Sequence, residues 1–130
     1  MTELISRLYA DLATVLGTGP LQPDGNGGIQ LAIGEDIQVT MFAEQDITLL
    51  LVIPIAPLPR AADYATTTWL LAQNLYTSSL APFRVACDER GTVLIWGRIP
   101  LADLTGETLA TLIDAVATEA TRLRTALAED

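Results

Sequence analysis

The segment DGNGGIQLAIGE, residues 24–35, places oxygen-bearing side chains at the spacing of a calcium-binding loop. Asp24, Asn26 and Glu35 fall at positions one, three and twelve of such a loop. The loop needs glycine at position six, where the chain turns sharply, and this sequence has Ile29 there. Histidine, the commonest metal ligand, is also missing from the chain. We therefore expect no calcium site and no other metal site.

Two pairs of adjacent carboxylates, Glu35 with Asp36 and Asp88 with Glu89, have the residue types for acid–base chemistry. Each pair lies in a predicted reversal between two strands, where we expect side chains to be hydrated. The glycines of GNGG, residues 25–28, could cradle a phosphate, but no lysine follows and the next element reads as a strand. These motifs predict turns and no catalytic centre.

The composition leaves few groups for catalysis. The 130 residues include no histidine and no lysine, so the commonest general base and the usual Schiff-base amine are both missing. We expect no enzyme activity and no cofactor, and a small enzyme or ligand-binding domain is the least favoured alternative. The net charge of -9 would repel phosphate backbones and anionic membranes. Nucleic acid is therefore not an expected partner.

Length and cysteine content predict a single domain, residues 1–130, that folds without a disulfide or a metal. Cys87 is the single cysteine, and its place on the apolar side of a predicted strand suggests a small buried residue. The longest apolar run, residues 49–56, is too short to span a membrane. No signal peptide is visible at the N-terminus. We expect a cytoplasmic protein without membrane insertion.

The spacing of apolar residues changes between the period of a helix and that of a strand along the chain. It predicts helices at residues 2–17, 60–80 and 105–127, and strands at residues 29–33, 36–42, 47–55, 83–87 and 92–99. Pro54 cannot donate to a strand ladder and predicts that its strand ends at a sheet edge. The order α-β-β-β-α-β-β-α predicts an α+β fold, with helices packed against a mainly antiparallel twisted sheet.

Two of these elements carry more apolar surface than one small domain covers. The helix at residues 60–80 has two stripes. The first consists of Tyr64, Thr68, Leu71 and Leu75, and the second consists of Ala65, Trp69, Ala72 and Tyr76. The strand at residues 92–99 is apolar on both faces, and Leu94 and Trp96 lie on its second face. We expect both second surfaces to be covered from outside the core of one subunit.

The first helix and the first two strands form another candidate surface. Its residues are Leu4, Leu8, Leu12, Ile33 and Met41. The helix stripe is wider than one sheet contact requires, and the second strand has a polar outer face and an expected open edge nearby. Each of these residues could equally belong to the chain's own core, so both interpretations stay open at this point.

Two stretches of the sequence resemble a known family when their order and spacing are taken together. They are GGIQLAIGEDIQVTM, residues 27–41, and LLAQNLYTSSLAPFRVACDERGTVLIWGRIPLADLTGETLATLIDAV, residues 70–116. The Asn74-Leu75 pair, the Pro100-Leu101 corner and the entry into the last helix at Thr105 follow the family's pattern. The chain resembles the class I chaperones of bacterial type III secretion, the family typified by the chaperone of the translocated intimin receptor.

The resemblance implies a homodimer formed through the second helix and the late hairpin. Its candidate interface residues are Trp69, Ala72, Tyr76, Leu94 and Trp96. It also implies binding of a partly unfolded, N-proximal effector segment, with the surface of Leu4, Leu8, Leu12, Ile33 and Met41 as the candidate contact. The secretion ATPase is a further candidate partner.

The sequence therefore predicts a cytoplasmic bacterial chaperone that works without ATP and keeps a secreted effector soluble and export-competent. The alternative is a regulatory protein of the same fold that binds a folded partner and has no secreted client.

Overall fold

The strands assemble into one antiparallel sheet. The computed structural model describes residues 3–34, 36–59 and 63–128. Its elements are α1 (Glu3–Leu16), β1 (Ile29–Ile33), β2 (Ile37–Glu44), β3 (Thr48–Pro57), α2 (Tyr64–Ala72), β4 (Arg84–Cys87), β5 (Thr92–Pro100) and α3 (Gly106–Ala128). The strand order is β1-β2-β3-β5-β4, and all neighbouring strands are antiparallel. The predicted α+β class and element order are confirmed.

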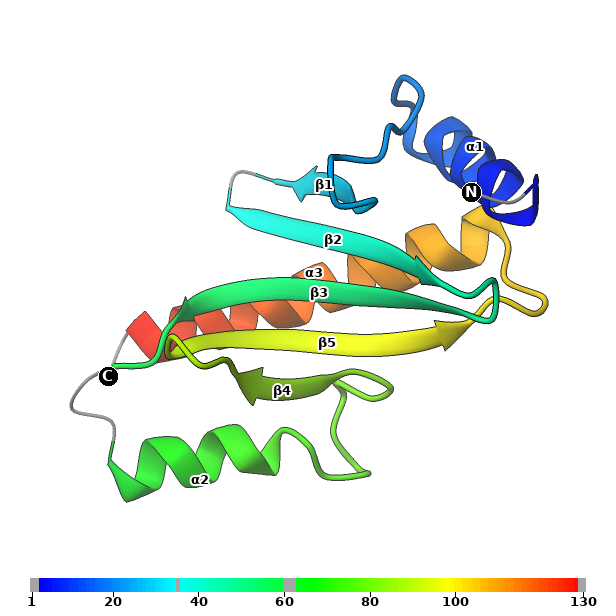
Figure 1. Ribbon diagram of the computed structural model, residues 1–130. Helices are drawn as coiled ribbons and strands as arrows, with labels where there is room; N and C mark the ends of the chain where they lie inside the picture. Colours follow the sequence, from blue (N-terminus) through cyan, green and yellow to red (C-terminus); the bar gives the residue numbers. More distant parts are fainter. Residues whose placement is uncertain (1–2, 35, 60–62, 129–130) are drawn as a thin grey trace.

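One face of the sheet forms the core with α1 and α3. Alternation along the strands brings Ile29, Met41 and Leu51 side by side across β1, β2 and β3, and all three are buried. α3 packs on β2, on β3 and on α1. Figure 1 shows α3 running behind the sheet for most of its length. The apolar stripes expected in the first and last helices therefore find their cover inside the chain.

α1 and α3 approach each other closely where α3 begins. Thr105 caps α3 by accepting a hydrogen bond from the N–H of Thr108 at 3.1 Å. At the next residue, Gly106, a Cβ atom would lie 2.8 Å from the carbonyl carbon of Asp11 and 2.9 Å from the nitrogen of Leu12. The two backbones thus touch, and a side chain at Gly106 would push the helices apart.

The prediction that Pro54 marks a sheet edge is wrong. β3 lies in the middle of the sheet, between β2 and β5. Pro54 pairs with Leu94, and the register then shifts so that Ala56 pairs with Val93. This irregularity is a β-bulge, which interrupts the ladder and so tolerates a residue without an N–H.

α2 is shorter than the sequence predicts. It runs over Tyr64–Ala72, whereas the apolar period continues to residue 80. The carboxylate of Asp63 caps it by accepting a hydrogen bond from the N–H of Thr66 at 2.9 Å. The predicted start at residues 60–62 lies outside the described residues, as does residue 2 of the first predicted helix. After Ala72 the chain forms turns that lead to β4.

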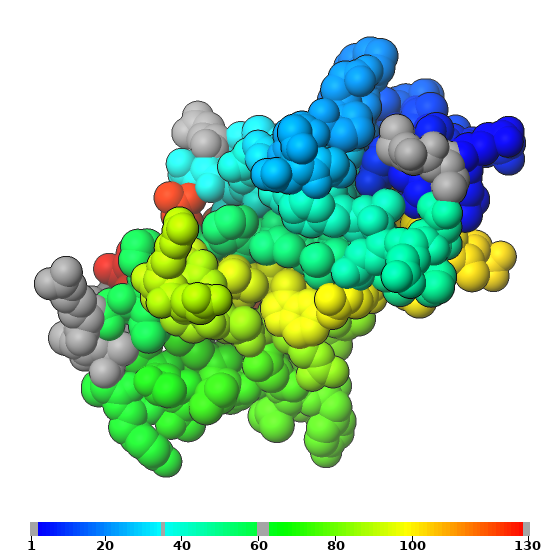
Figure 2. All heavy atoms as spheres, viewed as in Figure 1, coloured from blue at the N-terminus to red at the C-terminus, as the bar shows by residue number. Residues whose placement is uncertain are grey.

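None of the described helices lies on the second face of the sheet. In Figure 1 this face points to the viewer and α2 lies apart, beyond β4. Figure 2 shows β2, β3 and β5 forming the surface of this face. We call it the open face. Within the described ranges, no helix combines the length and the apolar character needed to cross a bilayer.

Candidate functional site

Two of the carboxylates considered for metal or acid–base chemistry, Asp24 and Asp88, organise turns instead, and Glu35 lies outside the described residues. Asp24 accepts hydrogen bonds from the N–H groups of Asn26 at 2.8 Å and Gly28 at 3.0 Å. Asp88 accepts in the same way from Arg90 and Thr92, each at 2.9 Å. No three His, Cys, Asp or Glu side chains in the described part of the chain cluster as metal ligands would. Large apolar side chains are exposed instead, among them Leu4, Leu71 and Tyr76, and the surfaces that they form are the candidate functional site.

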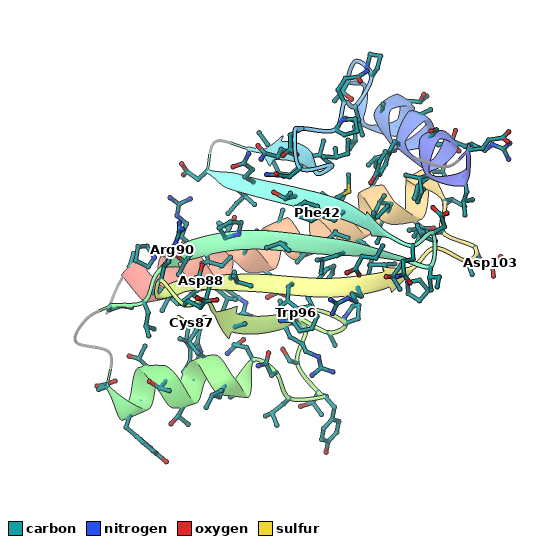
Figure 3. The ribbon with its side chains drawn as sticks, in the orientation of Figure 1. Phe42, Cys87, Asp88, Arg90, Trp96 and Asp103 are labelled. Atoms are coloured by element: carbon teal, nitrogen blue, oxygen red, sulfur yellow. The ribbon has the colours of Figure 1, made fainter. Side chains whose placement is uncertain are left out.

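Cys87 is exposed, and the prediction that it is buried is wrong. It lies opposite Val93 at the end of β4, and Figure 3 places it on the side of β4 nearest α2. There it lines a small apolar cavity of about 130 Å³ together with Leu70 and Leu71 of α2. Because α2 is short and leaves this cavity open, the thiol reaches solvent.

Three of the five candidate effector contacts belong to the core. Leu8, Leu12 and Met41 are buried in the layer between α1, α3 and the sheet. A partner could contact them only if the core opened, so their burial favours the alternative interpretation that they stabilise the fold. Leu4 is 51% exposed on α1, and Ile33 at the end of β1 is half-buried. These two therefore remain accessible at the surface as candidate contacts.

The open edge lies one strand further out than expected. β2 pairs with β1 on one side and β3 on the other, so the expected edge beside Met41 does not exist. β1 is the edge strand. Among the described residues, only β2 hydrogen-bonds to the main chain of Ile29–Ile33. The outward N–H and C=O groups of β1 are therefore available to another strand.

An open groove continues this surface from the end of β1 towards the C-terminal part of α3. Its volume is about 600 Å³, and it is lined by Ile33, Gly34, Asp36, Ile37, Thr121, Arg124, Thr125 and Ala128. Arg124 donates a hydrogen bond to the carbonyl of Asp36 at 2.8 Å and so joins the two sides. Sequence reasoning missed the α3 side, because these residues are nearly ninety positions away from β1 and no local pattern links them.

α2 carries two of the candidate dimer residues, Trp69 and Ala72, and is almost uncovered. Leu70 is its one buried residue among those described, and it belongs to neither predicted stripe. Trp69 is half-buried and Ala72 is exposed. Tyr76 is 91% exposed and lies in the turns after α2, so the predicted stripe ends at Ala72. The other predicted stripe is exposed as well, with Leu71 at 66%.

The open face carries the remaining candidate dimer residues. Leu94 and Trp96 are half-buried there, and Val52, Trp96 and Arg84 lie side by side on β3, β5 and β4. Figure 3 shows Trp96 on the face turned to the viewer. The guanidinium of Arg98 lies 5.3 Å from the centre of a Trp96 ring, a cation–π distance. An apolar patch with two arginines thus covers the middle of this face.

Arg98 is held over Trp96 by an ion pair. Its Nε lies 2.8 Å from Oε1 of Glu44, which also accepts a hydrogen bond from Thr48 at 3.0 Å. The hydrogen bond from Arg98, followed by the one from Thr48, holds the pKa of the Glu44 carboxyl below its ordinary value. The pair is solvent-exposed, so it orients the arginine more than it stabilises the fold.

Comparison with known proteins gives a family match over most of the chain. The model of the Tir chaperone protein (CesT) family matches residues 7–124. No curated protein sequence matches the chain.

Solved structures share the fold at low sequence identity. A chain of the ExsC-ExsE complex superposes with a TM-score of 0.80 at 22% identity, covering 98% of this chain and 96% of that one. A chain of the ExoU-SpcU complex from the type III secretion system of Pseudomonas aeruginosa gives a TM-score of 0.75 at 22% identity. The match covers 91% of this chain and 95% of that one. A chain from the Yersinia pestis type III secretion chaperone SycH, in complex with a stable fragment of YscM2, gives 0.74 at 21%, covering 91% and 98%.

Proposed function

Because the chain belongs to the Tir chaperone (CesT) family, we propose that it is a chaperone of type III secretion that binds a secreted effector. It acts as a cytoplasmic homodimer, without ATP, and holds an N-proximal effector segment in a soluble and export-competent form. The observation that carries the proposal is the family match over residues 7–124. The similar structures of SycH in complex with a fragment of YscM2 and of the ExoU-SpcU complex are in keeping with it.

The uncovered apolar surface supports a homodimer. Tyr64 on α2 is 86% exposed, Tyr76 in the turns after α2 is 91% exposed, and the open face adds the half-buried Leu94 and Trp96. Exposed apolar patches of this kind mark interaction sites in soluble proteins. In a twofold dimer each copy presents both surfaces, so α2 of one subunit and the open face of the other can cover each other.

The other end of the sheet supports binding of an extended segment. The β1 edge offers main-chain groups to an added strand, Ile33 offers an apolar contact at the end of that strand, and Leu4 offers a second one on α1. Main-chain hydrogen bonds supply affinity in strand addition, and side-chain pockets supply specificity. The binding free energy from these hydrogen bonds and side-chain contacts together has to offset the entropy that a disordered segment loses when it becomes ordered. The groove of about 600 Å³ beyond Ile33 extends the same surface.

The charge of the chain shapes the choice of client. With a net charge of -9, the protein stays soluble when a client is bound, and it attracts a client segment that has an excess of basic residues. Binding by mass action needs no nucleotide, since the energy comes from the contacts themselves.

The test is capture of the client from the native host. A tagged chain is purified from those cells, and bound proteins are identified by mass spectrometry. We expect a secreted protein bound through its N-proximal region, in the presence or absence of ATP. Recovery of a folded, non-secreted protein alone would contradict the proposal and support the regulatory alternative.

Two matched variants locate the client surface. Leu4→Asp places a charge on the exposed apolar side of α1, and Ile47→Asp places one on a comparably exposed residue at the β2–β3 turn. Both variants should keep the wild-type melting temperature. We expect Leu4→Asp to reduce capture and Ile47→Asp to leave it unchanged. Equal capture by both would show that α1 does not contact the client.

A further inference from the structure

The two edges of the sheet differ in whether the chain itself occupies them. At the β1 edge, no described residue outside β2 bonds to the strand's main chain. At the β4 edge, the side chain of Asn74 makes two hydrogen bonds to one residue. The N–H of Val85 donates to Oδ1 of Asn74 at 2.7 Å, and Nδ2 of Asn74 donates to the carbonyl of Val85 at 3.1 Å.

These two bonds replace the main-chain hydrogen bonds that an added strand would make to Val85. A carboxamide has the same donor and acceptor as a peptide group. Because both main-chain groups of Val85 bond to Asn74, they point away from β5 and out of the sheet. In an antiparallel strand every second residue points its main-chain groups to the same side, so Phe83 and Cys87 share this edge with Val85. The N–H of Phe83 is also taken, by the carbonyl of Leu80 at 2.9 Å.

We infer that Asn74 closes the β4 edge against strand pairing with a second copy of this chain. An exposed edge strand pairs readily with other chains, and proteins commonly block such edges. The turns at residues 73–82 lie where α2 was predicted to continue, and they bring Asn74 to β4. Under the proposed function, which this consequence rests on, β1 is then the one sheet edge at which a client strand can add.

The test compares three variants of the full chain. Asn74→Ala removes both bonds to Val85. The control, Gln73→Ala, removes a neighbouring carboxamide that accepts from Arg122 at 2.9 Å and makes no bond to β4. Asn74→Asp keeps the acceptor for the Val85 N–H and loses the donor, and it serves if Asn74→Ala does not fold. Melting temperature and circular dichroism establish which variants are folded.

Two measurements decide the matter without any client. In Asn74→Ala, hydrogen exchange at the Val85 amide should rise about tenfold relative to the amides of β3, and in Gln73→Ala it should not. Sedimentation velocity is measured from low micromolar to a few hundred micromolar protein. Asn74→Ala should form species larger than those of the wild type, and Asn74→Asp should associate more weakly. The control Gln73→Ala should show no added association. A folded Asn74→Ala or Asn74→Asp variant that sediments as the wild type does over this range overturns the inference.

A second substitution separates edge pairing from simple loosening of the fold. Cys87 points its main-chain N–H to the same side as Val85, so Cys87→Pro removes a donor from that edge without breaking the bonds to β5. Added to Asn74→Ala, it should return sedimentation to that of the wild type while leaving exchange at Val85 fast. Persistent association in the double variant would assign the effect to loosening and overturn the inference. Failure of the proposed function would leave both measurements unaffected.

Discussion

α3 and α2 are both apolar helices, but the chain covers one and leaves the other bare. α3 spans 23 residues, and its stripe, including Ile113, Val116 and Leu123, is buried against the sheet and α1. α2 spans 9 residues and buries Leu70, while Leu71 beside it is 66% exposed. An apolar period therefore indicates a helix that will be covered, but it does not say whether the cover comes from the same chain.

The largest effect on stability should come from shortening a buried side chain of α3, the covered helix. Ile113→Ala should lower the free energy of unfolding by about 2 to 5 kcal/mol, because it leaves a cavity in the core. Leu71→Ala, its counterpart on α2, should change it by about 0.5 kcal/mol or less when measured on the monomer. Urea unfolding of both variants checks this, and equal losses would mean that α2 is packed as tightly as α3.

Charging the uncovered helix should act on assembly. Trp69→Glu should weaken the proposed dimer by about a hundredfold, since an unpaired charge would be buried in an apolar interface. Thr118→Glu on the exposed side of α3 is the control and should leave the dimer intact. Sedimentation equilibrium measures both. If Trp69→Glu dimerises like the wild type, α2 does not lie in the interface.

A smaller effect, an increase in stability, is expected from a substitution on α1, which packs against α3. Within the described structure the Tyr9 hydroxyl is buried without a hydrogen-bond partner, and burial raises its pKa. Tyr9→Phe should therefore raise the free energy of unfolding by about 1 kcal/mol, because a buried unpaired polar group is removed. The measurement is again urea unfolding. A loss of stability would reveal a partner for the hydroxyl, such as a bound water.

The smallest effect concerns the N-terminus of α2 and depends on pH. The hydrogen bond from the Thr66 N–H lowers the pKa of Asp63, so the charged form is favoured in the folded state. A lowered pKa contributes stability above the unfolded-state pKa and loses it as pH falls through the folded-state value. α2 amides should therefore exchange faster, relative to β3 amides, in acid than at neutral pH.

Asp63→Asn provides the control for this pH effect. Asparagine caps helices as well as aspartate does but does not titrate. The variant should keep α2 and lose the extra acid sensitivity. An unchanged acid response in Asp63→Asn would assign it to another group.

Local patterns in the sequence predicted the order of the elements, and for β2 they also predicted the face that is buried. The second strand was expected to have a polar outer face, and Ile37, Val39 and Met41 on its other face are buried. The last helix was expected to begin at residue 105, and Thr105 caps it. The errors lie where a partner far away in sequence decides the outcome. α2 ends at Ala72 because the turns after it bring Asn74 to β4, eleven residues downstream at Val85.

The candidate surfaces were harder to predict, because exposure depends on neighbours that a local pattern does not contain. Leu4 and Leu8 occupy one stripe of α1, yet Leu4 is 51% exposed and Leu8 is buried. Met41 was expected beside an open edge, and the pairing of β1 with β2 removed that edge. Pairing order and helix packing are long-range properties, so the local pattern did not indicate which of these residues are buried and which are exposed.

The close contact of α1 with α3 at Gly106 also bears on the synthesis of the protein. The first helix packs against the last one, so α1 cannot reach its native packing until α3 has emerged from the ribosome. Until then the apolar face of β2 and β3 lacks its cover, and the nascent chain is open to aggregation. While it is being made, the protein is therefore exposed to the same hazard from which, as proposed, it protects its client.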